Sequence, residues 1–145
     1  MKYLLLIMIF GVAACSAPAI IKPVLDSNKP LATVVVSRES GRRIGEGALY
    51  FGEGKHAYFV MTSAGRQTVT LPAGNHTFVL STKGTASSSI KVDLAPDSTT
   101  CLRVYQNEAN FIGKFLLPFL RNAVPEFSAE IIDCAMPKVT GAGNS

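Results

Sequence analysis

The residues best equipped for covalent chemistry in this chain are three cysteines, Cys15, Cys101 and Cys134, and two histidines, His56 and His76. A thiol can carry an acyl group, form a disulfide or bind a metal, and an imidazole can act as a general base. Each of these functions needs particular neighbours at particular spacings. Which chemistry each residue can support therefore depends on the sequence around it.

Cys15 ends a segment that is typical of a bacterial export signal. One lysine precedes an apolar run over residues 3–10, and small residues occupy positions 11–14. This run is shorter than the about 20 residues that a membrane-spanning helix needs. Residues 12–15, Val-Ala-Ala-Cys, resemble the lipobox of bacterial lipoproteins. The resemblance implies a signal peptide over 1–14 and a diacylglycerol on Cys15; the alternative is an ordinary secretory signal in which this thiol is incidental.

The residues after Cys15 indicate where the protein is held. Ser16 is not the aspartate that, by the same resemblance, typically retains lipoproteins in the inner membrane. We therefore expect an outer-membrane anchor, with the protein facing the periplasm and the membrane as its first partner. Each acyl CH₂ that enters the bilayer contributes about 0.8 kcal/mol, and two chains give stable anchoring. Residues 15–31 contain three prolines and no periodicity, so they predict a flexible tether.

Cys101 and Cys134 are predicted to form a disulfide, because an exported chain folds in an oxidising compartment. In the predicted strand over 100–105, Cys101 lies on the side opposite Leu102 and Val104. In the last predicted strand, over 126–134, the inward positions are Phe127, Ala129 and Ile131, which leaves Cys134 on the outward side. Both thiols thus leave the non-core side, and adjacent antiparallel strands would let them meet. Two free thiols or a metal site are the alternatives; two cysteines without nearby histidines fall short of four metal ligands.

Short alternating segments separated by glycine and proline turns predict the fold. The segments cover residues 32–37, 48–51, 57–61, 67–71, 76–81, 88–94 and 101–105. This spacing favours an all-β protein, an antiparallel β-sandwich of about seven strands over residues 32–134. Residues 135–145 are predicted to be a disordered C-terminal tail.

A phenylalanine-rich segment interrupts the strand pattern at residues 110–122. Its apolar residues suit a short helical insert before the last strand, although Gly113 and Pro118 disfavour one regular helix. One interpretation is a lid over an open end of the sandwich. The other is an exposed apolar patch that contacts a partner, for which Phe111 and Phe119 are the candidate residues.

Residues 65–78 carry a more specific pattern: a strand, then Leu-Pro-Ala-Gly-Asn-His, then a second strand. This pattern resembles the core of PEGA-type domains and of a related family of small bacterial lipoproteins of unknown function. The resemblance implies a β-sandwich and no catalysis.

The sequence lacks the common motifs of catalytic sites. No Gly-x-Ser-x-Gly nucleophile elbow occurs, and the glycine-rich residues 41–47 lack the Lys-Ser/Thr ending of a phosphate-binding loop. We interpret His56 and His76 as residues of turns or strand starts, and the sequence predicts no metal site and no cofactor. The 14 Lys and Arg residues are scattered against 10 Asp and Glu, which gives no basic patch for nucleic acid.

These patterns together predict a non-enzymatic, membrane-anchored envelope lipoprotein that binds or assists an envelope partner. An alternative is an inhibitor or immunity-type lipoprotein that acts on an envelope hydrolase through a protruding loop, at residues 82–89 or 52–55. A third class, a hydrolase that uses His76 with a nearby serine, is the least supported by the sequence.

Overall fold

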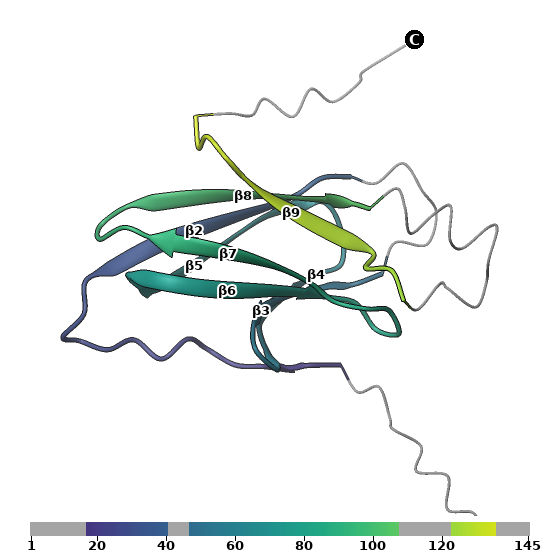
Figure 1. Cartoon of the computed structure of the whole chain (residues 1–145), viewed down its shortest axis with the longest axis horizontal. Helices are drawn as coiled ribbons and strands as arrows, with labels where there is room; N and C mark the ends of the chain where they lie inside the picture. Colours follow the sequence, from purple (N-terminus) through teal and green to yellow (C-terminus); the bar gives the residue numbers. More distant parts are fainter. Residues whose placement is uncertain (1–16, 41–46, 108–122, 136–145) are drawn as a thin grey trace, which may run out of the picture.

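The computed structural model describes residues 17–40, 47–107 and 123–135, and these form nine β-strands in two sheets that pack face to face (Figure 1). Sheet A contains five strands, in the order β1 (Ala19–Ile20), β4 (His56–Met61), β3 (Leu49–Glu53), β6 (Gly74–Ser81) and β7 (Ser88–Leu94). Sheet B contains four strands, in the order β5 (Gly65–Pro72), β2 (Leu31–Arg38), β8 (Thr99–Gln106) and β9 (Phe127–Ile132). The predicted all-β sandwich is thereby confirmed.

Strand β2 shows how the sequence produces this architecture. Its residues alternate strictly between buried and half-buried positions, with Val34 and Val36 fully buried. β-branched residues suit this position because β2 lies inside sheet B, between β5 and β8. The last inward position of the strand is Arg38, a charged residue that continues the buried series.

Aromatic rings fill the centre of the core between the sheets. The Phe51 ring of β3 stacks on Phe59 of β4 and on Phe78 of β6, with centroid distances of 5.2 and 4.9 Å. Leu102 and Val104 of β8 face these rings from sheet B and are fully buried. Full burial of each such side chain contributes about 1.5–3 kcal/mol to the hydrophobic stabilisation of the fold.

The direction and number of the strands differ from the sequence-based expectation. β2 pairs with β8 in parallel, and so does β1 with β4, so both sheets are mixed rather than antiparallel. The described residues contain nine strands rather than about seven. Alternation of polar and apolar residues shows which face of a strand is buried, but it does not encode the direction of the neighbouring strand. The predicted helical insert at residues 110–122 lies outside the described residues, as do residues 136–145 of the predicted tail.

Part of the predicted tether is bound to the domain. β1 adds to the edge of sheet A, and the Ile21 N–H donates to the Ala57 carbonyl oxygen at 2.8 Å. From there the chain runs along one edge of the molecule to β2 (Figure 1). The unpaired backbone groups of an edge strand accept any extended segment, which explains why residues expected to be free of the sandwich pair with β4.

The inward face predicted for β9 is correct at its start and wrong at its end. Phe127 is buried and Ala129 packs against the core, but the Ile131 side chain is 56% exposed. β9 is the edge strand of sheet B and pairs with β8 alone (Figure 1). Its last residues therefore extend beyond the cover that sheet A provides.

Candidate functional site

The predicted disulfide is present in the structure. The bond joins Cys101 to Cys134, and their Cα atoms are 5.2 Å apart, within the usual range of about 4.4–6.8 Å. Cys101 pairs in register with Ile132 of β9, so the bond runs diagonally to a residue just beyond that strand. The parity argument from the sequence therefore identified the side of the sheet on which the two thiols meet.

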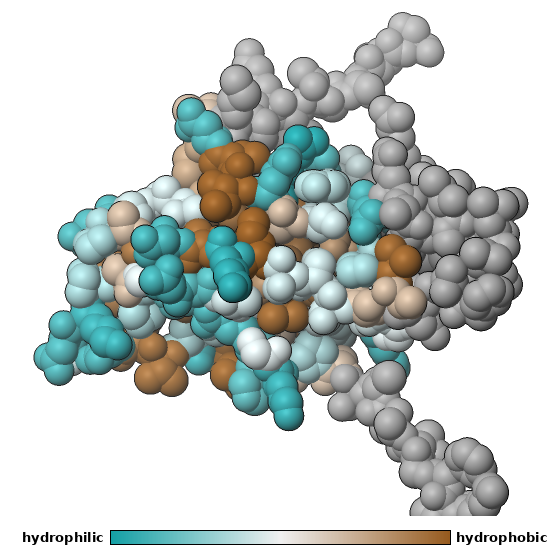
Figure 2. Space-filling model, viewed as in Figure 1, coloured by the Kyte–Doolittle hydropathy of each residue, from teal (hydrophilic) through white to brown (hydrophobic). Residues whose placement is uncertain are grey.

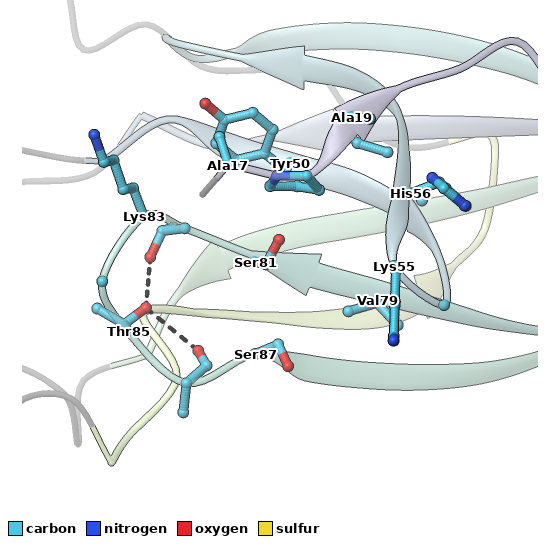
Figure 3. A pocket seen from close by; sticks show the side chains of 17 residues that line it. Ala17, Ala19, Tyr50, Lys55, His56, Val79, Ser81, Lys83, Thr85 and Ser87 are labelled. Atoms are coloured by element: carbon cyan, nitrogen blue, oxygen red, sulfur yellow. Dashed lines mark hydrogen bonds between the residues drawn. The ribbon is translucent and has the colours of Figure 1, made fainter. Parts of the chain in front are cut away.

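A groove of about 750 Å³ lies on the outer face of sheet A (Figure 3). Residues 17–19 and the β3–β4 hairpin form one wall, and residues 82–87, which connect β6 to β7, form the other. Tyr50 and Val79 belong to the strands that form the floor. Three separate segments of the chain thus meet around one open surface, which we call the outer groove.

A glycine keeps the floor of the outer groove low. The pairing of β3 with β4 shifts register after Phe51, so that Gly52 pairs with Ala57 and Tyr58 becomes an extra, bulged residue. A Cβ atom on Gly52 would lie only 2.1 Å from the His56 carbonyl oxygen. Position 52 therefore requires glycine, and no side chain rises from the sheet at this point.

The rim of the outer groove is positively charged. Lys55 and His56 lie at one end, Lys83 lies at the other, and none of the described lining residues is acidic. Hydroxyl groups of the β6–β7 connection add neutral hydrogen-bonding capacity, and the Thr82 and Thr85 hydroxyls bond to each other at 2.5 Å (Figure 3). The arrangement suits a ligand that carries negative charge and several hydrogen-bonding groups.

A second cavity, of about 340 Å³, lies at the end of the sandwich where residues 21–24 cross it. The Tyr58 hydroxyl donates to Glu53 Oε2 at 2.5 Å, and His76 Nδ1 lies 2.8 Å from Glu53 Oε1. His76 Nε2 lies 2.8 Å from the Pro72 carbonyl oxygen. Burial, together with the hydrogen bond and negative charge of Glu53, raises the pKa of the Tyr58 phenol well above its usual range.

This cluster corrects the interpretation of His76 as a simple turn residue. His76 belongs to β6, shares its inward face with Phe78 and Leu80, and stacks on the Phe78 ring at 5.6 Å. Its two ring nitrogens contact Glu53 and Pro72, so the structure does not pair this imidazole with a serine hydroxyl. Alternation with Phe78 was the signal in the sequence for an inward His76. The bulge that turns Tyr58 toward Glu53 gave no such signal.

A third polar cluster occupies the opposite end of the sandwich. Arg38 donates to the carbonyl oxygens of Met61 and Gly47, and its guanidinium lies 4.8 Å from the centre of the Phe127 ring. The Gly47 N–H donates to Glu126 Oε1 at 3.0 Å. Two buried charged residues therefore bind the backbone of the same glycine, Arg38 at its carbonyl group and Glu126 at its N–H, just before the chain enters sheet A.

Three residues singled out in the sequence, Cys15, Phe111 and Phe119, lie outside the described residues, and their roles stay predictions. Within residues 17–40, 47–107 and 123–135, no three His, Cys, Asp or Glu side chains gather as a metal-binding group. The same residues contain no helix with the length and apolar character needed to cross a membrane.

The fold and the disulfide define a small, stapled β-sandwich with a groove on one outer face. No family model, no curated protein and no solved structure matches the chain.

Proposed function

We propose that this protein is a lipid-anchored component of the bacterial envelope, held on the periplasmic side of the outer membrane, that binds a partner and catalyses no reaction. The lipobox-like residues 12–15 and the small exported β-sandwich support the anchor and the compartment. The resemblance of residues 65–78 to PEGA-type domains supports a β-sandwich without catalysis, and these residues span β5 and the first part of β6.

The outer groove carries the proposal. Its walls come from distant parts of the sequence, its floor is kept low by Gly52, and its rim bears Lys55 and Lys83. Complementary charge guides association and suppresses wrong partners. The partner is therefore an envelope protein that presents a segment with acidic and hydroxyl-bearing side chains to the groove.

The anchor is tested by replacing the thiol. Cys15→Ala leaves an unacylated precursor, which takes up no labelled palmitate and is lost from the outer-membrane fraction, because the diacylglycerol has no attachment point. Cys101→Ala is the matched control, since it also removes one thiol but keeps the lipobox. Palmitate incorporation into Cys15→Ala would show that the lipid is attached elsewhere or not through this motif.

The groove is tested by photo-crosslinking in intact cells. A benzophenone amino acid at Val79, on the groove floor, captures one discrete envelope protein, whereas the same group at Thr68, exposed on β5 of the other sheet, does not. Charge reversal by Lys55→Glu with Lys83→Glu abolishes the capture. Equal capture at both positions would contradict the groove as the binding surface. If the captured protein is a hydrolase that the lipoprotein inhibits, the inhibitor alternative replaces the accessory role.

A further inference from the structure

Exposed apolar side chains concentrate in one short stretch of the described chain. Among the described residues, five large hydrophobic side chains are exposed, and four of the five lie between residues 20 and 25: Ile20 (56%), Ile21 (41%), Val24 (87%) and Leu25 (51%). Single exposed hydrophobic residues are ordinary, but a contiguous group marks a contact surface. We call residues 20–25 the apolar strap.

The structure fixes where the apolar strap lies. β1 pairs Ile20 with Ala57, and the Ile21 N–H is bonded to the same residue, so the start of the strap is attached to the edge of sheet A. The strap then runs along the lower edge of the molecule in Figure 1, where Figure 2 shows apolar side chains at the surface. The described chain begins only three residues before the apolar strap, at residue 17, and β1 joins it to the same edge of sheet A.

Chain length then limits how far the apolar strap can be from the anchor. Cys15 precedes Ile20 by five residues, and a fully extended chain spans at most about 3.6 Å per residue. Ile20 is therefore within about 18 Å of the residue whose acyl chains enter the bilayer. The polar region of each leaflet is itself about 5–8 Å thick.

We propose that the apolar strap rests in the interface of the same bilayer that holds the lipid anchor, as a second membrane contact. The inference depends on the proposed lipidation of Cys15. Lys22 lies within the apolar strap and Lys29 lies four residues after it, against one acid, Asp26, and the two ammonium groups suit the phosphates of anionic headgroups. A second copy of the chain would have to reach a surface that the anchor already holds beside the membrane.

This contact would set the orientation of the domain. Residues 17–19 form a wall of the outer groove, and the apolar strap begins at the end of the same strand. A strap seated in the headgroups therefore holds the groove at the membrane surface rather than at the end of a free tether. The partner of the groove would then be met close to the bilayer.

The chain contains no tryptophan, so one introduced tryptophan reports its own surroundings. Val24→Trp in the acylated full-length protein, reconstituted into phosphatidylethanolamine and phosphatidylglycerol vesicles, should show blue-shifted emission and strong quenching by lipids brominated near the headgroup. Lys91→Trp is the matched control, because residue 91 is exposed on β7, at the opposite edge of sheet A. Its emission should stay that of a tryptophan in water, without quenching.

The outcomes separate the two proposals. Protein that floats with the vesicles but shows no difference between Val24→Trp and Lys91→Trp overturns the membrane contact and leaves the anchor intact. Protein that takes up no palmitate and fails to float overturns the anchor, and the contact with it. A Val24→Trp shift that grows with the ratio of protein to lipid, without quenching by brominated lipid, overturns the contact in favour of a second copy.

Discussion

The two ends of the sandwich place polar groups between the sheets in different ways. At one end, Arg38 and Glu126 are 3% and 6% exposed, and both bind the backbone of Gly47. At the other end, the side chains of Glu53 and His76 are 30% and 13% exposed, and they line a cavity. We call the first end, whose charged groups are buried, the closed end, and the second, whose polar groups are partly exposed, the open end.

The difference follows from the cost of burying a charge. A fully desolvated charge is tolerated only where hydrogen bonds replace its water, so the Arg38 end must keep one arrangement. A partly exposed cluster keeps some of its hydration and can change partners at lower cost. We therefore interpret the Arg38 end as a rigid structural cluster that stabilises the fold. The Glu53 end is the part of the sandwich whose polar side chains can rearrange at lower cost.

The largest expected effect is at the closed end. Arg38→Ala should lower the free energy of unfolding by about 3–5 kcal/mol, because the carbonyl oxygens of Met61 and Gly47 lose this donor and the Phe127 ring loses the guanidinium packed against it. Urea denaturation of the purified domain measures the change. Arg103→Ala is the matched control: this arginine contacts Glu39 and Glu130 at the surface, and its loss should cost less than about 1 kcal/mol. Equal losses of unfolding free energy for the two variants would show that the buried arginine stabilises the fold no more than the surface arginine does.

The second prediction concerns the disulfide, which lies toward the open end. β8 begins at the same end as β2, since the two strands are parallel, and Leu31 of β2 pairs with Pro72 beside His76. Replacing Cys101 and Cys134 together by serine should lower the free energy of unfolding by about 2–4 kcal/mol. The double variant should also show faster amide exchange at this end than at the closed end. Equal rates of amide exchange at the two ends would contradict a specific role of the disulfide in stabilising the open end.

The smallest of the three effects belongs to the open cluster. Tyr58→Phe removes the hydrogen bond to Glu53 and should cost about 1–2 kcal/mol at neutral pH. The raised pKa of Tyr58 means that the folded state keeps the phenol proton when the unfolded state releases it, above about pH 10. The difference between wild type and Tyr58→Phe should therefore be full below that pH and shrink as pH rises beyond it.

Denaturation curves at about pH 8 and about pH 10.5 test this dependence around the ordinary phenol pKa. Tyr50→Phe, in the outer groove, controls for the loss of one phenol. A difference that stays constant or widens with pH would show that the Tyr58 proton does not stabilise the fold.

The sequence predicted the strands well because burial imposes an alternation that can be read locally. Each predicted segment from 32–37 to 88–94 falls on a strand, apart from residue 48, which precedes β3, and the parity of Cys101 and Cys134 led to the correct disulfide. Pairing direction and the edge strand β1 were missed, since they depend on which strands meet in space rather than on their residues. β1 is only two residues long, which is too short to carry a pattern.

The polar clusters were harder to predict than the core. Arg38 occupies the position that follows Val34 and Val36 in the inward series, so the sequence did contain a signal that a charge is buried there. Gly47, which accepts from Arg38, and Glu126, which accepts from Gly47, are 9 and 88 residues away from Arg38 along the chain, and nothing in the local pattern connects them. The outer groove depends on the bulge at Tyr58 and on Gly52. Position 52 requires glycine because a side chain there would collide with the His56 carbonyl oxygen on the neighbouring strand.

The bond between Cys101 and Cys134 closes a covalent loop across a sequence separation of 33 residues. A protease that cuts once inside this loop cannot release either fragment, because the two pieces remain joined through sulfur. The cut protein would migrate as one species without reductant and as two with it. Residues 110–122 fall between the two cysteines in the sequence, so a cut of the backbone at any of them would leave β9 covalently attached to β8.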